Sequence, residues 1–260
     1  MSAPVTQLPL KRDTLSSQVT RYLLDLIASQ ALRPGDFVPS EVEICRSLNV
    51  SRGIVREAYR SLATLGILEI ESGKRPKVQR PNASVLQQLI EFELRTAHLT
   101  VAQVLQLRRA IEIEMARLAA EQGTEEQFER LRKLVDEMHQ AQGDHERIIA
   151  ADVAFHTTLA EATGNPLFAL MIAGLRGPLE GSMAHGLGSR RTREEVLQVP
   201  ELHRNIVQRI CARDGRGAGK AMALHFDVAV AAILAAGCTD GAATAKGAVS
   251  NRQRASRGKI

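Results

Sequence analysis

The sequence predicts a mainly α-helical protein, in which an N-terminal winged helix-turn-helix precedes an all-helical antiparallel bundle of about seven helices. Aromatic residues make up 3% of the chain and tryptophan is absent, so aliphatic side chains must build the core, which favours helices. Apolar residues recur at helical spacing along most of the chain. Only two short extended runs, at residues 67–70 and 76–78, break this pattern and predict a small hairpin.

Length and cysteine usage bound the class of protein. A chain of 260 residues is long enough for two domains. Its three cysteines form no CxxC pair, which argues against a disulfide framework and against a thiolate zinc site. No apolar run has the length of a signal peptide or a membrane span, so we expect a cytoplasmic protein with no membrane partner.

Charge is unevenly distributed along the chain. Residues 1–81 carry 12 basic and 8 acidic side chains, residues 82–236 carry 17 and 20, and residues 237–260 carry 5 and 1. A basic first domain is expected of a nucleic-acid-binding protein, although many basic surfaces are only solvated charge.

The first 80 residues predict three helices and the hairpin. A first helix ends before a turn at residues 32–36. Ser40 is a favourable N-cap for a second helix, and Glu43 completes a capping box. Ser51 can cap a third helix, which Gly66 ends. The hairpin that follows has the position of a wing.

Residues 84–236 predict helix after helix, and the polar residues at four of the breaks are suitable N-caps: Thr100, Thr124, Asp144 and Asn165. Both chain ends, residues 1–12 and the basic tail at 237–260, have a composition that predicts disorder. The predicted domains are therefore a winged helix-turn-helix at 1–80, a helical domain at 84–236 and the tail.

The third helix carries residues suited to reading DNA. In a winged helix-turn-helix this helix enters the major groove and contacts bases near its N-terminus. Ser51 suits a phosphate contact, and Arg52 and Arg56 lie one turn apart, where each can bond a guanine edge. A small helical domain with solvated arginines is the alternative that spacing alone leaves open.

The stretch from Leu32 to Val78 resembles the GntR family of bacterial regulators. The resemblance rests on Arg33-Pro34-Gly35-Asp36, Pro39-Ser40-Glu41, Val50-Ser51-Arg52, Val55-Arg56-Glu57-Ala58, Leu62, Gly66-Ile67-Leu68 and Gly73-Lys74. It implies a homodimer that binds a short palindromic operator in double-stranded DNA. The family often has a basic residue where this chain has Val42, so we do not expect a DNA contact from this position of the second helix. The predicted DNA-binding residues are Arg33, Ser51, Arg52, Gly53, Arg56, Gly73 and Lys74.

The helical domain contains a candidate metal-binding set. Asp152 and His156 are four residues apart and share a helix face. His203 and His225 each lie eleven residues from Asp214, the centre of a predicted turn, so an antiparallel hairpin places them at the same height. A carboxylate and three imidazoles, without thiolate, favour zinc and also admit nickel, manganese or iron. Histidines that serve only the core or the surface are the alternative.

The segments around these four residues, with Gly164-Asn165-Pro166-Leu167, look like the FCD ligand-binding domain of the FadR-like branch of GntR regulators. The likeness spans about residues 84–235. In the metal-binding members an Asp and three His hold the ion, which implies the same role for Asp152, His156, His203 and His225. Such members sense small organic acids whose carboxylate or hydroxyl joins the metal. The fatty-acyl regulator that names the branch lacks this set, so an acyl-CoA effector is disfavoured.

Arg108 is the candidate effector-binding residue. It lies within the inward apolar stripe of its helix, whereas Arg109 lies beside the stripe, nearer the flank with Glu112. A buried guanidinium needs an anionic partner, which an effector carboxylate can supply. A structural ion pair with a neighbouring acid is the alternative.

Together these features predict a ligand-responsive transcription regulator and not an enzyme. The family resemblance implies a repressor, and an activator is the alternative that the residues leave open. A metal-dependent hydrolase and a direct metal sensor are alternative uses of the Asp/His₃ set. The hydrolase leaves the winged helix unexplained, and no further acid beside the set has the position of a general base.

Overall fold

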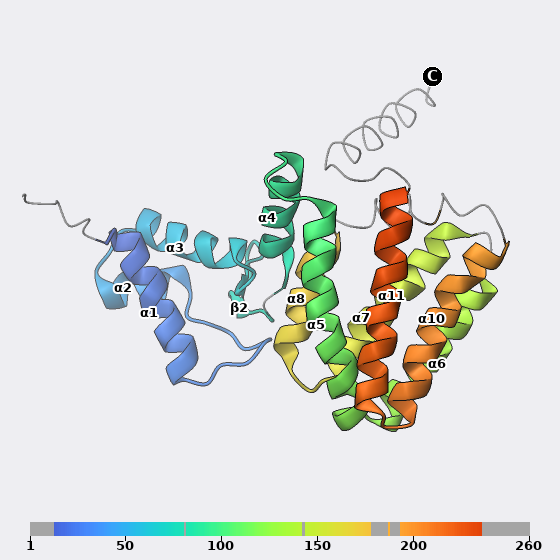
Figure 1. Ribbon diagram of the computed structural model, residues 1–260. Coiled ribbons are helices and arrows are strands. Elements are labelled where there is room, and N and C mark those ends of the chain that lie inside the picture. The colour runs from blue at the N-terminus through green and yellow to red at the C-terminus, as the bar shows by residue number, and fades with distance from the viewer. Residues whose placement is uncertain (1–12, 81, 142–143, 178–186, 188–192, 236–260) are drawn as a thin grey trace, which may run out of the picture. The chain divides into compact units, whose positions relative to one another are not determined.

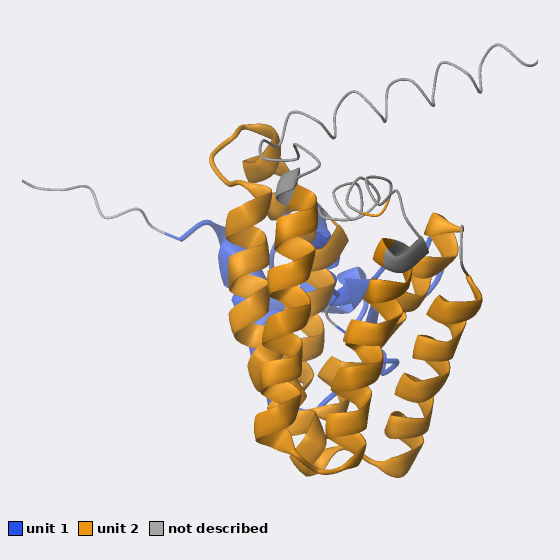
Figure 2. Cartoon of the chain, turned by 45° about the vertical axis from the view of Figure 1, so that its right-hand side comes forward, with its two compact units in different colours: residues 1–85 blue, residues 86–260 orange. Residues whose placement is uncertain are grey.

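The computed structural model describes residues 13–80, 82–141, 144–177, 187 and 193–235 (Figure 1). The chain forms two compact units, residues 1–85 and 86–260, which Figure 2 distinguishes by colour. The segments expected to be disordered, 1–12 and 237–260, lie outside the described residues. None of the described helices is both long enough and apolar enough to cross a membrane.

The first unit is a winged helix-turn-helix, as predicted. Strand β1 pairs with β2 in an antiparallel hairpin, with Leu68 opposite Val78. Leu23, Val55 and Tyr59 are fully buried in a core to which all three helices and the hairpin contribute. The elements are α1 (Leu15–Ser29), α2 (Glu41–Leu48), α3 (Arg52–Thr64), β1 (Leu68–Glu69) and β2 (Lys77–Val78).

The start of α2 is fixed by the predicted capping box. The Glu43 carboxylate accepts a hydrogen bond from the Ser40 backbone N–H at 2.6 Å, and the Ser40 hydroxyl accepts one from the Glu43 N–H at 3.3 Å. The Tyr59 hydroxyl on α3 donates to the Pro39 carbonyl at 2.5 Å and ties α3 to the beginning of α2. Ser51 occupies the N-cap of α3, but its side chain makes no capping hydrogen bond.

The second unit is an all-helical bundle, as predicted, with seven helices among its described residues. Thr100, Thr124, Asp144 and Asn165 cap α5, α6, α7 and α8 through their side chains, which confirms all four predicted N-caps. The helices are α4 (Ser84–Arg95), α5 (Val101–Gln122), α6 (Glu125–Gln140), α7 (His145–Ala162), α8 (Pro166–Arg176), α10 (Arg193–Cys211) and α11 (Gly215–Ala235).

Helix α5 lies at the centre of this bundle and packs against α7, α8, α10 and α11. Helices α10 and α11 form a hairpin that packs against α5 and, through α10, against α6 (Figure 1). Met115, Phe155 and Phe226 are buried between these helices. The same interior also encloses a group of buried polar side chains, which form the candidate site.

Candidate metal centre

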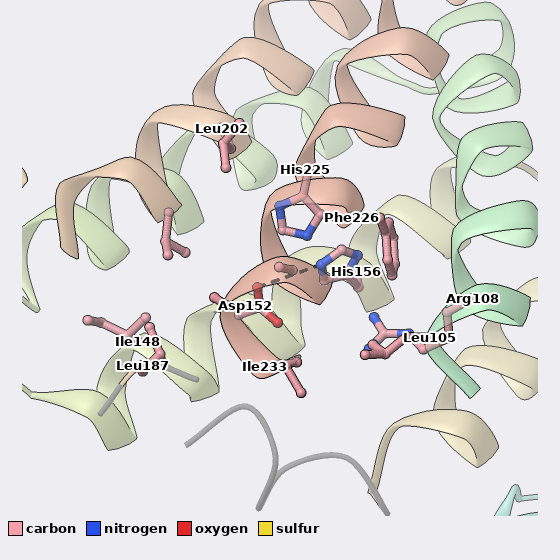
Figure 3. A pocket seen from close by; sticks show the side chains of 13 residues that line it. Leu105, Arg108, Ile148, Asp152, His156, Leu187, Leu202, His225, Phe226 and Ile233 are labelled. Atoms are coloured by element: carbon pink, nitrogen blue, oxygen red, sulfur yellow. Dashed lines mark ion pairs between the residues drawn. The ribbon is translucent and has the colours of Figure 1, made fainter. Parts of the chain in front are cut away.

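Four side chains that the sequence nominated as metal ligands meet inside the bundle. Asp152 and His156 come from successive turns of α7, His203 from α10 and His225 from α11. Each offers a ligand atom, and these atoms all lie within 4.8 Å of one another. All four residues are buried. Figure 3 shows the side chains of Asp152, His156 and His225 close together among the residues that line a pocket.

The α10–α11 turn brings two of these histidines together. Arg213 adopts a left-handed conformation, with φ of 57°, and the Asp214 carboxylate accepts a hydrogen bond from the Gly217 N–H at 2.8 Å. The chain therefore reverses sharply at Asp214. The rings of His203 and His225 lie 4.4 Å apart between centroids, as their equal distance from the turn predicts.

Two of the imidazole rings are oriented by oxygen atoms outside the set. The Nδ1 of His203 lies 2.8 Å from the Val199 carbonyl oxygen, so this nitrogen carries the proton and donates it. The Nδ1 of His156 faces the carboxylate of Glu112. In both rings the other nitrogen, Nε2, faces Oδ1 of Asp152, at 3.0 Å from His203 and 3.6 Å from His156.

This arrangement fits a cation. With its single proton on Nδ1, a neutral His203 presents a lone pair from Nε2 to a carboxylate oxygen 3.0 Å away. A metal ion, or a second proton on the ring, removes the repulsion between these two acceptors. The Nδ1 of His225 is also buried without a hydrogen-bond partner among the described residues. Nitrogen and oxygen donors without thiolate suit a divalent transition metal.

Burial and charge shift the pKa values within the set. Burial, with the neighbouring His203 and His156, lowers the pKa of His225 well below its usual value, so this ring stays neutral and able to bind metal. Burial raises the pKa of Asp152, but His156 and His203 outweigh it and hold that pKa well below its usual value. Burial lowers the pKa of His156, but Glu112 and Asp152 raise it to about 9.

A cavity opens beside the four residues (Figure 3). Its volume is about 80 Å³, and it is partly open to solvent. Asp152, His156 and His225 supply polar groups to its wall, and Arg108 supplies a guanidinium. The other described lining residues are apolar, among them Leu105 and Phe226. A small anion with an apolar body matches this lining.

Arg108 is buried, as its position in the apolar stripe predicts, and it lines the cavity. Its Nε donates to Oε1 of Glu112 at 2.7 Å, so the alternative of a structural ion pair is present in the structure. The sequence predicted that Glu112 lies with Arg109 on the flank of the helix, beside the apolar stripe, and this was wrong. Glu112 is fully buried and contacts Arg108, whereas Arg109 pairs with Asp227 on α11.

The seven residues predicted to bind DNA are all exposed on the first unit. Arg52 and Arg56 lie in the first two turns of α3, and the Nε of Arg56 is 3.4 Å from a carboxylate oxygen of Glu41. Gly73 lies in the wing with φ of 77°, and Lys74 beside it pairs with Glu71. The DNA contacts themselves stay a prediction.

Comparison with known proteins assigns a family to both units. Residues 15–78 match the family model of bacterial regulatory proteins, gntR family, and residues 103–228 match the FCD domain. The HTH-type transcriptional repressor NanR of Salmonella newport is 32% identical over 222 residues, which cover 84% of this chain and 85% of that protein. NanR of Cronobacter sakazakii is 37% identical over 163 residues, 62% of this chain and 63% of that protein.

A solved structure agrees with this assignment. The structure of Streptococcus agalactiae GntR superposes with a TM-score of 0.64 at 28% identity, covering 83% of this chain and 98% of that one. These relatives are transcription regulators and not enzymes, which removes the metal-dependent hydrolase as a reading of the Asp/His₃ set. The chain belongs to the GntR family of bacterial transcription regulators, and its helical unit is an FCD domain.

Proposed function

We propose that the chain is a repressor that binds a palindromic operator as a homodimer and responds to a small organic acid bound at a divalent metal ion. The NanR relatives are named transcriptional repressors, which supports repression as the mode of action. The observation that carries the metal and effector part is the buried Asp/His₃ set, of which Asp152, His156 and His225 line the cavity.

Asp152, His156, His203 and His225 would hold the ion. The metal, when bound, supplies a Lewis-acidic centre that attracts a carboxylate or hydroxyl oxygen. Zinc is the ion we favour, with nickel, manganese or iron as alternatives, because the donors are three nitrogens and one oxygen.

Arg108 would recognise the acid from the other side. Its Nε donates to Glu112, and the residue also lines the cavity. A second carboxylate oxygen of the effector can accept hydrogen bonds from it. Apolar residues such as Leu105 and Ile233 would contact the body of the effector.

In the first unit, α3 would lie in the major groove, with Arg52 and Arg56 at base edges. Ser51 supports this placement, because its hydroxyl is not used as a cap and is exposed at the helix N-terminus, where a phosphate is favoured. Arg33, Gly53, Gly73 and Lys74 would contact the DNA backbone or the minor groove.

Metal analysis of the purified protein tests the central part of the proposal. We expect about one zinc, nickel, manganese or iron ion per chain, and its loss in a His203→Ala/His225→Ala variant, because two of four ligands are removed. The matched control is His98→Ala, which removes an exposed imidazole outside the set. Absence of bound metal in the unmodified protein, after supply of each of the four ions, would reject the metal site.

The effector is tested by thermal shift with a panel of small carboxylic acids. An acid that joins the metal should raise the melting temperature of the metal-loaded protein and of the His98→Ala variant. It should have no effect on the His203→Ala/His225→Ala variant or after chelation. Equal shifts in all of these samples would remove the metal from effector binding.

A further inference from the structure

Glu112 is a fully buried carboxylate that belongs neither to the four-residue set nor to the described wall of the cavity. It lies on α5, one turn after Arg108. Oε1 of its carboxylate accepts the hydrogen bond from Arg108 Nε at 2.7 Å. Oε2 faces Nδ1 of His156, on the neighbouring helix α7. Both oxygens of this buried group are therefore directed at specific partners.

The position of Glu112 determines which nitrogen of His156 can bind an ion. A neutral imidazole carries one proton, and the nitrogen without it holds the lone pair. A carboxylate at Nδ1 keeps the proton there and leaves Nε2, which faces Asp152, as the ligand atom. His203 has the same arrangement, with the Val199 carbonyl at Nδ1 and Nε2 toward Asp152.

We infer that Glu112 is a positioning residue for the metal centre, holding the ring of His156 in the orientation and tautomer in which Nε2 binds the ion. This inference rests on the proposed function, since it requires that the set binds a metal. A carboxylate acceptor also increases the basicity of the ring it bonds, which strengthens the bond from Nε2 to the metal.

Arg108 holds the Glu112 carboxylate in the position that this role requires. Its Nε donates a hydrogen bond to Oε1 at 2.7 Å, so the buried carboxylate has a cationic partner inside the bundle. Because Arg108 contacts Oε1, Oε2 is left for His156. Arg108 thus has a structural task in addition to the effector contact proposed above.

Zinc affinity of full-length variants, measured by competition with a chelator, tests the role of Glu112. Loss of Glu112 alone leaves the Arg108 guanidinium buried without its partner, which endangers folding. The test variants are therefore Arg108→Met/Glu112→Leu and Arg108→Met/Glu112→Gln. The control is Glu114→Gln, which removes a partly exposed carboxylate from the same helix, where it pairs with Arg117.

We expect the Leu variant to bind zinc about 10- to 100-fold more weakly than the unmodified protein. The Gln variant should retain part of the affinity, because its amide oxygen still accepts the hydrogen bond from Nδ1 of His156. The control should bind like the unmodified protein. The visible spectrum of bound Co²⁺, which reports coordination directly, should change in the Leu variant and less in the Gln variant.

Two results would overturn the inference while leaving the metal site intact. One is zinc binding by the Leu variant within about twofold of the unmodified protein, with the same Co²⁺ spectrum. The other is an equal loss of affinity in the Leu and Gln variants that parallels a fall in their metal-free melting temperature, because this indicates only a packing role. An unmodified protein that binds no metal overturns the proposed function and this inference together.

Discussion

Four polar side chains form a line of contacts inside the second unit. The Arg108 guanidinium contacts Glu112, Glu112 contacts His156, and His156 faces Asp152. Arg108 and Glu112 compensate each other's charge, and removal of either one leaves an uncompensated buried charge. The line joins the cavity wall at Arg108 to the candidate ligands, so residues of the two proposed sites are in direct electrostatic contact.

Helix geometry explains why Arg108 was predicted and Glu112 was not. Successive residues are about 100° apart around a helix, so Glu112 lies about 40° from Arg108 and about 60° from Arg109. The apolar stripe identified Arg108 as inward, but a carboxylate at the edge of the stripe was assigned to the exposed flank. The signal that was available is the i,i+4 spacing of Arg and Glu within a buried stripe.

Glu43 predicts a pH-dependent contribution to the stability of the first unit. Hydrogen bonds from the backbone and side chain of Ser40 lower the pKa of Glu43 below its usual value of about 4.3. A carboxyl group whose pKa is lower in the folded state stabilises the protein above its unfolded-state pKa, and this contribution disappears as the pH falls through the folded-state pKa. Glu43→Gln should therefore destabilise the first unit at pH 7, and the difference from the unmodified protein should diminish below about pH 4.3.

Tyrosine fluorescence during urea unfolding measures this effect in the full chain. The protein has no tryptophan, and both of its tyrosines, Tyr22 and Tyr59, lie in the first unit. The control is Glu57→Gln on α3, an exposed carboxylate outside the capping box. A stability difference for Glu43→Gln that stays constant from pH 7 to pH 3 would contradict the prediction.

At the scale of elements, the α10–α11 hairpin shows how far spacing alone can place side chains. The rise per residue of a helix is fixed, so residues at equal distances from a tight turn lie at equal heights. His203 and His225 meet for this reason, and Asp152 and His156 share a face of α7 because they are four residues apart. The approach of α7 to the hairpin depends on packing across the bundle, which spacing does not determine.

At the same scale, we predict that operator binding depends on Arg52 and Arg56 of helix α3. Each arginine that bonds a guanine edge through two hydrogen bonds contributes about 1–3 kcal/mol of discrimination. We expect Arg52→Ala/Arg56→Ala to weaken binding about 30-fold or more and to remove the preference for operator over random DNA. Folding should be retained, because both side chains are exposed and the ion pair from Arg56 to Glu41 lies at the surface.

Fluorescence anisotropy at fixed salt, with an operator selected from a random palindromic library, measures this change. The control is Arg130→Ala/Arg132→Ala, which removes two exposed arginines from α6 of the second unit and alters net charge equally. The assignment of α3 fails if the two double variants lose the same affinity, because net charge would then account for the loss.

At the scale of the whole chain, the sequence predicted the two kinds of domain but not the cavity. The cavity wall combines side chains from α5, α7, α10 and α11, for example Leu105, Ile148, Leu202 and Ile233. Each of these residues has the periodicity of an ordinary core position. The space between them arises from the distances between helices, which the sizes of all the packed side chains set together. The sequence pattern of a single helix therefore does not predict the distances between helices or the cavity.

The proposed switch requires that effector and operator binding oppose each other through the whole molecule. If the acid weakens operator binding by a given factor, linkage requires the operator to weaken acid binding by the same factor, typically 5- to 150-fold. The acid that gives the largest thermal shift should therefore have a higher Kd when the protein is saturated with operator. Calorimetric titration of the acid into protein with and without operator, beside anisotropy of the operator with and without acid, measures both factors.

The same pair of titrations on His203→Ala/His225→Ala shows whether the response of operator affinity to the acid depends on the metal ligands. This variant should retain operator affinity, because its changes lie in the second unit, and it should show no response of that affinity to the acid. A ligand that binds the operator-binding state and the other state with equal affinity does not shift the equilibrium between them, however tightly it binds. Acid binding that leaves operator affinity unchanged in the metal-loaded, unmodified protein would therefore make the cavity a binding site without a regulatory role.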